Sequence, residues 1–395
     1  MSTPIKIPLS RPDITDEDRA LVLATLRTPQ LSLGPRLREF EEKFARFLEV
    51  KHAVAVNSGT SALHLCVRAL GIGEGDAVIT TPFSFIASAN CLLFERARPV
   101  FVDIDPETLN IDPEQIEAKA KELRRKRSGG AGRGKAKAGR LKAILPVHVF
   151  GRPCDMPAIM EIAKRYELDV IEDSCEALGA ELRTKSGEWR KAGSFGRCAA
   201  FGFYPNKQMT TGEGGMVVTD DARIAALCRS MRNQGRSDKA AWLQHERLGY
   251  NYRLSDINCA LGISQLSRLK EMIAKRARVA GWYEERIKDL AQVIVPKQGE
   301  RERISWFVYV IQLSKRFSRK DRDRILAGLR AQGIACSNYF TPIHLQPFYR
   351  KAFGFKPGDF PVTESAGART VALPFFNLMR EEQVDSVGEC LKELL

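Results

Sequence analysis

The stretch FGFYPNKQMTTGEGG, residues 201–215, surrounds a lysine that has the setting of a reactive amine. Lys207 follows an apolar, strand-like run and precedes a turn with three glycines in four residues. Glycine lets the backbone adopt positive φ and approach another group closely. An amine held among apolar walls gives up its proton more readily and can form an imine with an aldehyde. The pattern indicates a special lysine but leaves its partner open, and a solvated surface lysine is the ordinary alternative.

A second candidate element is the turn NSGTSA, residues 57–62, between an apolar run and a helix-like segment. Gly59, Thr60 and Ser61 would offer backbone N–H groups and hydroxyls at a helix N-terminus. The positive end of the helix dipole and these donors suit a phosphate monoester. A simple helix cap after a tight turn explains the same residues equally well.

Two further residues could complete a site for a flat heterocycle. Asp173 ends the apolar run 168–173, and ligands of parallel sheets collect beyond the carboxyl ends of strands. A carboxylate there could pair with a protonated pyridine nitrogen and keep the ring an electron sink. Phe85, after TPFS, could stack on the ring. A turn-forming aspartate and a core phenylalanine are the ordinary alternatives.

These residues require a framework that brings strand ends together, and the sequence supplies one. Short apolar runs alternate with helix-like segments through the first 260 residues. The strand-like runs are 52–57, 77–81, 98–104, 142–149 and 168–173, and the helix-like segments between them are 61–70, 85–95, 113–123 and 157–166. This alternation predicts an α/β fold with a mainly parallel central sheet sandwiched by helices.

The pattern changes after Ser255. A long helical stretch runs to about residue 290, followed by a strand-like run at 304–313, a helix at 319–332 and a terminal helix from Glu381. We therefore predict a large domain over residues 1–255. Residues 256–395 are expected to form a linking helix and a smaller C-terminal α+β domain.

The net charge of +14 is concentrated in one segment. Residues 119–142 hold eleven Lys or Arg and one acidic residue, Glu122, which is +10 and leaves about +4 for the rest. Residues 124–140 contain no large apolar side chain and predict a flexible basic insertion. A tether for nucleic acid or anionic lipid is the functional alternative to a solvated loop, and it is the only support for a basic regulatory or nucleic-acid-binding protein.

The remaining composition excludes several classes. The nine cysteines form no C-x-x-C pair, which predicts reduced thiols and no metal site. No run of about 20 apolar residues could cross a bilayer, and the first residues lack the apolar core of a signal peptide. We expect a soluble, cytoplasmic protein without membrane insertion or a specific nucleic-acid partner.

Taken together, the motifs resemble the DegT/DnrJ/StrS family of nucleotide-sugar aminotransferases. The similarity runs from about Arg11 to the C-terminus. It is carried by SLGPRLREFEEKFA, NSGTSAL, TPFSFIASAN, PVFVDID, EDSCEALGA, FYPNKQMTTGEGG, LGYNYRLSDINCALG, TPIHLQPFY and ALPFFNLM. The resemblance implies fold-type I, the aspartate aminotransferase superfamily, and pyridoxal 5′-phosphate as cofactor.

The resemblance also implies roles for individual residues. Lys207 would form the Schiff base with the cofactor and move the proton between cofactor and substrate carbons. Asp173 would pair with the pyridinium nitrogen, and Phe85 would stack on the ring. Thr60 and Ser61, together with the backbone at Gly59, would bind the phosphate.

Asn251, in GYNYRLSD, matches an asparagine that family members donate to the phosphate of the neighbouring subunit. This implies a homodimer with shared active sites; capping of the next helix is the local alternative. His344, in TPIHLQPFY, corresponds to a residue that often lines the sugar site, although a lone histidine is more often structural.

Two positions depart from the family pattern. Many members carry serine five residues before the lysine as a phosphate ligand, and here that position is Gly202. The position three after the aspartate is commonly glutamine, and here it is Glu176. A carboxylate beside the phenolic oxygen of the cofactor would be repelled unless it carries a proton.

The implied reaction is a ping-pong transamination from an amino acid, most often glutamate, to a keto group on a nucleotide-linked deoxysugar. The TTGEGG run after the lysine is more typical of members that act at C4 than at C3. The expected role is synthesis of a cell-surface polysaccharide or a secondary metabolite. A C3 keto-sugar or a cyclitol ketone is the alternative substrate within the family.

Overall fold

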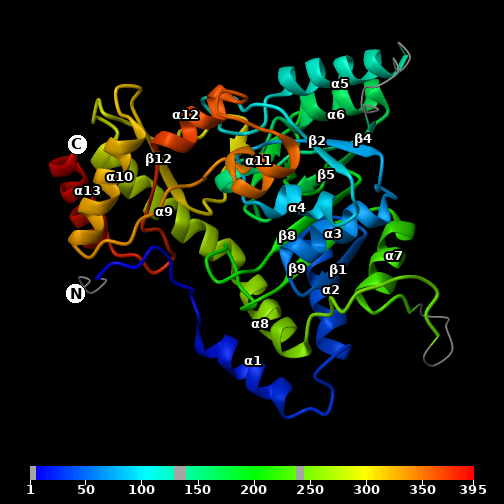
Figure 1. Ribbon diagram of the computed structural model, residues 1–395. Coiled ribbons are helices and arrows are strands. Elements are labelled where there is room, and N and C mark those ends of the chain that lie inside the picture. The colour runs from blue at the N-terminus through cyan, green and yellow to red at the C-terminus, as the bar shows by residue number, and fades with distance from the viewer. Residues whose placement is uncertain (1–5, 129–138, 237–243) are drawn as a thin grey trace.

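The computed structural model describes residues 6–128, 139–236 and 244–395. The first two helices are α1 (Asp16–Leu26) and α2 (Pro35–Leu48) (Figure 1). A capping box between Thr15 and Asp18 fixes the start of α1. The apolar residues of α2 form a buried face that includes Leu37, Phe40 and Phe44.

The large sheet has seven strands in the order β1-β9-β8-β5-β4-β2-β3. Within the described chain, β9 runs antiparallel to the other six strands of this sheet, which are parallel to one another, and this confirms the predicted mainly parallel sheet. The strands are β1 His52–Val56, β2 Asp76–Thr80, β3 Arg98–Phe101, β4 Arg140–Leu145, β5 Asp169–Asp173, β8 Cys198–Gly202 and β9 Gly215–Thr219.

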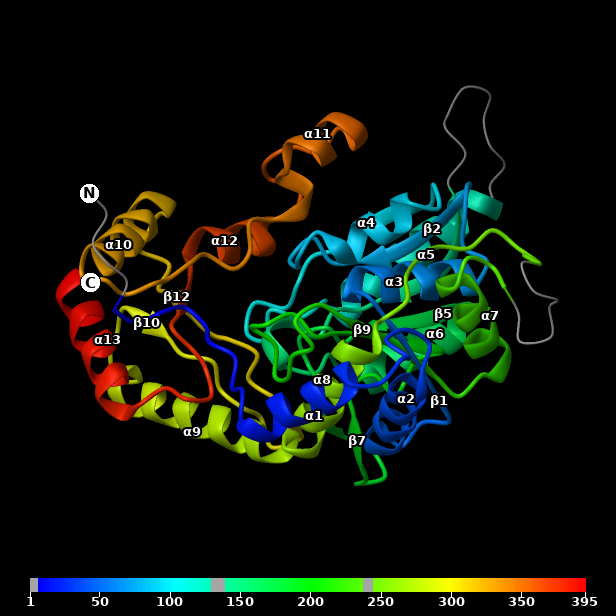
Figure 2. The ribbon, with the colours of Figure 1, turned by 90° about the horizontal axis from the view of Figure 1, so that it is seen from below.

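Helices cover both faces of this sheet (Figure 2). Alternate side chains of a strand point to opposite faces, so Val54 of β1 joins one core and Ala55 joins another. One face is covered by α3 (Gly59–Ala69), α4 (Ala87–Leu93) and α7 (Ala222–Arg232). The other face is covered by α2, α5 (Pro113–Ser128), α6 (Met156–Tyr166) and α8 (Asp256–Ser267).

A second hydrophobic core lies at the far end of the long helix α9 (Leu269–Ile287) (Figure 1). There a three-stranded sheet, β10-β12-β13, packs with α9 and with two further helices. The elements are β10 Val293–Ile294, β12 Tyr309–Leu313, β13 Thr370–Leu373, α10 Arg319–Ala331 and α13 Glu381–Leu394. Ile7 bridges to Ile334, so the first described residues also run along this core. The domain boundary at residues 255 and 256 stays a prediction.

Some elements differ from the sequence-based expectation. The helical stretch after Ser255 is two helices, α8 and α9, which meet at Arg268, where the backbone leaves helical geometry (φ −103°, ψ 3°). Elements that the sequence did not reveal are the three-stranded sheet β11-β6-β7, with β6 Glu181–Arg183, β7 Trp189–Lys191 and β11 Glu302–Arg303, and the helices α11 Pro347–Phe353 and α12 Pro361–Arg369.

The predicted basic insertion is placed only in part. Residues 124–128 are the last residues of α5, and residue 140 begins β4, because strand pairing with β2 extends to Arg140. The rest of the segment, 129–138, lies outside the described residues. The cysteines are all free thiols. No group of metal-binding side chains and no helix able to cross a membrane occurs in the described ranges.

Candidate active site

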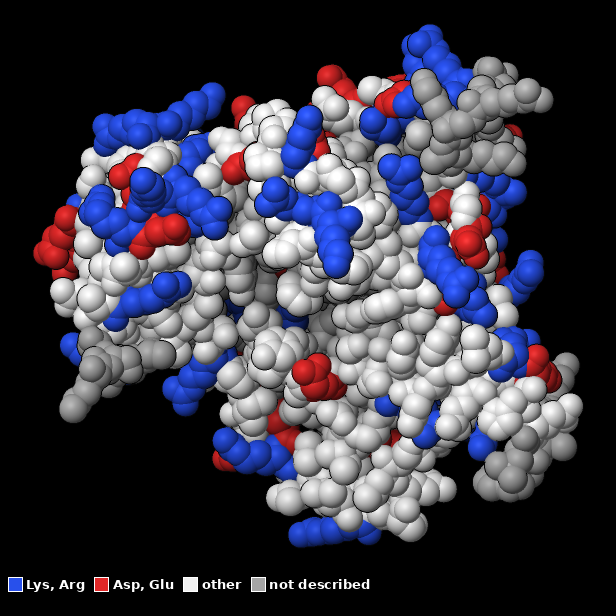
Figure 3. All heavy atoms as spheres, in the orientation of Figure 1, with Lys and Arg blue, Asp and Glu red and all other residues white. Residues whose placement is uncertain are grey.

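A cavity of about 640 Å³ opens between the carboxyl ends of the large sheet and the segments that lead to the second core. Figure 3 shows the surface hollowed between these two parts of the molecule. The large sheet contributes the start of α3, the β2–α4 loop and the ends of β5 and β8. Phe307, Asn338, Tyr339 and Phe340 close the cavity from the other side. Its volume suits a small-molecule ligand.

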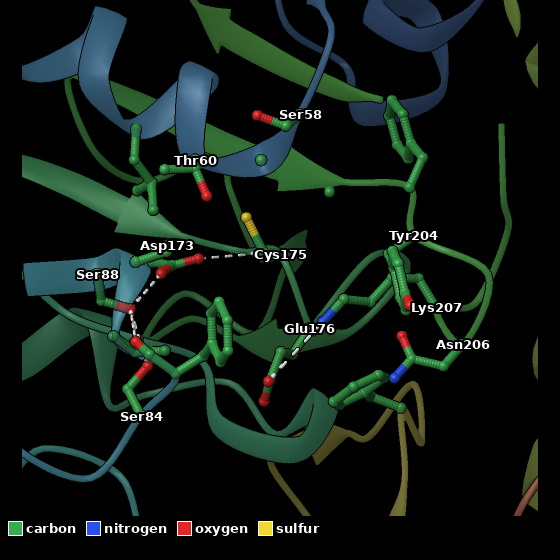
Figure 4. Close-up of a pocket in the computed structure, with 18 of the residues that line it drawn as sticks. Ser58, Thr60, Ser84, Ser88, Asp173, Cys175, Glu176, Tyr204, Asn206 and Lys207 are labelled. Atoms are coloured by element: carbon green, nitrogen blue, oxygen red, sulfur yellow. Dashed lines mark hydrogen bonds and ion pairs between the residues drawn. The ribbon is translucent and has the colours of Figure 1, made fainter. Parts of the chain in front are cut away.

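One end of the cavity holds Asp173, the last residue of β5. Its Oδ2 accepts a hydrogen bond from the Ser88 hydroxyl at 2.7 Å, and its Oδ1 accepts one from the Cys175 N–H at 3.1 Å (Figure 4). Because a hydroxyl has one proton, Ser88 donates to Asp173 and accepts from Ser84 at 2.8 Å. The side chain of Asp173 is thus fixed from two sides and only 4% of the residue is exposed.

The other end holds Lys207, in the loop after β8, and Figure 4 shows it across the cavity from Asp173. Its Nζ lies 3.8 Å from the centre of the Phe307 ring and 3.8 Å from Glu176 Oε1. The buried guanidinium of Arg276, on α9, donates to the backbone carbonyls of Lys207 at 2.9 Å and Phe307 at 3.0 Å. One cation therefore ties together the linking helix, the lysine loop and the aromatic wall.

Glu176 lies between the two ends of the cavity. It is buried, with 6% exposure, and its Oε2 accepts the Phe150 N–H at 2.9 Å. Burial raises the pKa of this carboxyl, and the nearby Lys207 opposes the rise without cancelling it. Glu176 therefore holds its proton to a higher pH than an ordinary glutamate.

The N-terminus of α3 forms the wall above Asp173 and Cys175 (Figure 4). Ser58 caps the helix by accepting the Ser61 N–H, and the first N–H groups of a helix cannot all be paired within it. A side chain at Gly59 would approach the Cys175 sulfur to 2.9 Å and Gly202 Cα to 3.2 Å, so this position requires glycine. At Gly202 a Cβ would meet nothing closer than 3.5 Å, so the missing hydroxyl there is not forced by lack of space.

The structure brings most of the candidate residues together. Those that line the cavity are Gly59, Thr60, Phe85, Asp173, Glu176, Gly202 and Lys207. The Ser61 hydroxyl is directed to the Asn57 side chain at 2.7 Å. Asn251 is exposed and is not among the lining residues. His344 is fully buried and bonds to Glu364 through Nε2 at 3.0 Å, away from the lining residues.

Several lining residues escaped the sequence analysis. Ser84 precedes α4 and Ser88 lies in its first turn, and two hydroxyl residues four positions apart around Phe85 were the signal available for them. Asn206 and Tyr204 flank the lysine within the same motif. The aromatic wall of Phe307, Tyr339 and Phe340 carries no comparable signal because these residues look like ordinary core residues.

The chemistry of this residue set fits pyridoxal phosphate. The α3 N-terminus, with the hydroxyl of Thr60, offers donors to a phosphate and has no room for a side chain at Gly59. An amine and a fixed carboxylate lie on opposite sides of the cavity, as a reactive aldehyde and a ring nitrogen require. Phe85, 62% exposed, offers a ring face at the same cavity.

Comparisons with known proteins agree with this interpretation. The profile of the DegT/DnrJ/EryC1/StrS aminotransferase family matches residues 12–392. The GDP-perosamine synthase of Caulobacter vibrioides is 38% identical over 398 residues, with 100% of both chains covered. The spore coat polysaccharide biosynthesis protein SpsC of Bacillus subtilis is 38% identical, with 98% of this chain and 97% of that protein covered. The crystal structure of DesV of S. venezuelae, in complex with a ketimine intermediate, is 31% identical and superposes with a TM-score of 0.86 over 99% of this chain and 98% of that chain. This likeness confirms the predicted fold.

Proposed function

Because the chain belongs to the DegT/DnrJ/EryC1/StrS aminotransferase family, and is therefore an aminotransferase, we propose that it uses pyridoxal 5′-phosphate to aminate a nucleotide-linked keto-deoxysugar. The amine donor is an amino acid, L-glutamate, and the acceptor is a keto group at C4 of the sugar. Relatives named for perosamine synthesis and for spore coat polysaccharide support a role in polysaccharide synthesis. Amination at C3, or of a cyclitol ketone, is the second candidate within the same family.

The observation that carries this proposal is the placement of Lys207 and Asp173 on opposite sides of one cavity. When bound, pyridoxal phosphate supplies an aldehyde that accepts amines and a ring that takes up electrons. Asp173 would hold the ring nitrogen in its protonated form, and Ser88 and the Cys175 N–H keep this carboxylate in place. Lys207 would hold the aldehyde and carry a proton between the reacting carbons. Its amine lies over the Phe307 ring, which fixes one side of its position.

The walls of the cavity support these roles of Asp173 and Lys207. Phe203, Phe307 and Phe340 exclude water, which strengthens the electrostatic interactions inside. The donors at the start of α3 would anchor the phosphate and so orient the ring between Asp173 and Lys207.

We also propose a homodimer in which Asn251 of one subunit binds the phosphate at the other. Asn251 is exposed and does not line the cavity of its own chain, which supports this arrangement. Several large apolar side chains of the described residues are exposed, among them Phe85, Phe94, Tyr204 and Leu248. Such side chains, when they gather on a surface, mark a contact with another protein.

The acceptor is tested by supplying the purified protein with pyridoxal phosphate, glutamate and a panel of nucleotide-linked keto sugars. Mass spectrometry and NMR of the product identify the aminated carbon. We expect amination at C4 of a deoxysugar nucleotide. Product only from cyclitol ketones, or only at C3, would contradict the proposed substrate and leave the aminotransferase assignment standing.

Lys207→Ala tests the catalytic assignment. We expect turnover to fall by at least about a hundredfold, because a positioned proton carrier contributes on that order or more. The visible absorbance of the bound cofactor should disappear on dialysis against an amine, since the covalent attachment is lost. Lys185→Ala, at an exposed lysine paired with Glu161, is the matched control and should behave as the unchanged protein. A Lys207→Ala protein that retains colour and activity would refute the assignment.

A further inference from the structure

A cluster of polar side chains lies beside the candidate active site without lining it. Its centre is Glu95, which lies just after α4. The side chain of Glu95 is 9% exposed. Its Oε1 accepts hydrogen bonds from His64 Nε2 at 2.8 Å and the Tyr250 hydroxyl at 3.0 Å, and its Oε2 accepts one from Arg68 at 2.5 Å. Three donors on one sheltered carboxylate make a strongly held arrangement.

The charges in this cluster agree with that geometry. Burial disfavours ionisation of Glu95, but the hydrogen bonds from His64, Arg68 and Tyr250 outweigh it and lower the pKa of this carboxyl. Burial also lowers the pKa of His64 in spite of the neighbouring glutamate. The cluster therefore combines a carboxylate with a neutral imidazole, which can donate through Nε2 and accept through Nδ1.

The cluster fastens two tyrosines that flank Asn251. Tyr250 bonds directly to Glu95, and the Tyr252 hydroxyl lies 3.0 Å from His64 Nδ1. The two tyrosine rings stack on each other, with centroids 4.9 Å apart and planes 13° apart. The His64 ring packs against Tyr250, with centroids 4.7 Å apart.

The backbone around Asn251 is extended. Antiparallel hydrogen bonds join Tyr250 to Gln234 and Tyr252 to Arg232, and Asn251 bridges to Asn233. Residues two apart in an extended segment share a face, and the residue between them points to the opposite face. With Tyr250 and Tyr252 turned to the Glu95 cluster, the Asn251 side chain is directed away from it, where it is exposed.

We propose that Glu95 is a positioning residue for the active site of the neighbouring subunit. Through Tyr250 directly, and through His64 and Tyr252, it holds Asn251 in the orientation that reaches the cofactor phosphate bound by a second copy of this chain. This inference rests on the proposed dimer with shared sites. Its competitor is an action within the same chain, because His64 and Arg68 lie on α3, whose N-terminus forms the phosphate wall.

Mixed dimers with a single functional lysine distinguish an action of Glu95 on the neighbouring subunit from an action within its own chain. In the first mixed dimer, one subunit carries both Lys207→Ala and Glu95→Gln and the other is unchanged. In the second, one subunit carries Lys207→Ala and the other carries Glu95→Gln. If Asn251 acts across the dimer, the site with the intact Lys207 receives Asn251 from a subunit that carries Glu95→Gln in the first dimer only.

We expect the first mixed dimer to bind pyridoxal phosphate about tenfold more weakly at its intact site, as for the loss of one hydrogen bond to a charged group. The second should match a dimer that carries Lys207→Ala alone, within about twofold. A general loss of stability would not produce this asymmetry. The reverse pattern, or equal loss in both dimers, would overturn the proposal.

Further variants keep the result interpretable. Asn251→Ala in place of Glu95→Gln tests the shared site itself. If Asn251→Ala acts across the dimer and Glu95→Gln does not, the role of Glu95 is refuted and the shared site stands. If Asn251→Ala does not act across the dimer, the shared site and the role of Glu95 are both refuted. Tyr250→Phe removes one hydrogen bond and serves if Glu95→Gln does not fold. Glu74→Gln, at an exposed glutamate, is the matched control and should change neither dimer.

Discussion

The two carboxylates that face the candidate active site are held in different ways. Asp173 accepts hydrogen bonds on both oxygens, from the Ser88 hydroxyl and the Cys175 N–H. Glu176 accepts one backbone N–H, from Phe150, on one oxygen, and its other oxygen lies 3.8 Å from Lys207 Nζ. Burial raises the pKa of Glu176 above its ordinary value.

The difference indicates how the cavity divides its work. The end with Asp173 is fixed by donors that belong to the fold, so its carboxylate is ready for a cation without rearrangement. At the other end, one Glu176 oxygen accepts a backbone N–H and the other lies 3.8 Å from the Lys207 amine. Under the proposed function, the Asp173 end would hold a protonated ring nitrogen and the Lys207 end would carry the reacting groups.

The largest effect on this contrast is expected from Asp173→Asn. The amide keeps the size of the side chain but removes the charge that would stabilise a protonated ring nitrogen. We expect kcat to fall by about a hundredfold or more, the loss typical of an electrostatic partner, and the visible spectrum of the bound cofactor to shift. Asp169→Asn, at the other end of β5, is the control. Equal activity of the Asp173 variant and the control would break the proposed division.

A smaller effect is expected from Ser88→Ala, which removes the 2.7 Å hydrogen bond to Asp173. Asp173 keeps its charge and the Cys175 N–H, so we expect kcat to fall roughly tenfold, on the order of one hydrogen bond to a charged group. The KM for glutamate should change little. Ser88→Thr should restore most of the activity because it restores the hydroxyl; a threonine variant as slow as the alanine variant would show that packing, not the hydrogen bond, matters here.

The smallest effect is expected from Glu176→Gln, and it concerns pH. Since the pKa of Glu176 in the folded chain lies above its ordinary value of 4.5, the folded chain keeps this proton where the unfolded chain has released it. The stability that follows is complete below pH 4.5 and is lost as pH rises through the folded-state pKa. The glutamine variant should lose less stability with rising pH.

Thermal unfolding of the cofactor-free protein between about pH 5 and pH 8 measures this difference. One group changes the slope of unfolding free energy by at most about 1.4 kcal/mol per pH unit. Parallel pH profiles for Glu176→Gln and the unchanged protein would mean that Glu176 does not keep its proton longer than an ordinary glutamate. The contrast between the two carboxylates would then rest on their hydrogen bonds alone.

Much of the fold follows from local sequence. Apolar runs and helix-like segments placed β1 to β5 and their helices close to where the structure has them, because burial of one face dictates the period of apolar residues. The prediction of one long helix after Ser255 was wrong, because nothing in the apolar pattern marks the break at Arg268. The order of strands in the sheet was not predicted, since pairing depends on contacts far apart in the chain.

The sequence by itself determined which chemistry is present: an amine in a glycine-rich turn, a carboxylate at a strand end, and a helix N-terminus with hydroxyls. Each of these is a local pattern of residue type and spacing. Tertiary structure alone decided what surrounds them. Ser88 bonds to Asp173 from 85 positions away, Arg276 to the Lys207 backbone from 69, and Tyr250 to Glu95 from 155. Such bonds depend on which helices and loops pack side by side, and no local period records that packing.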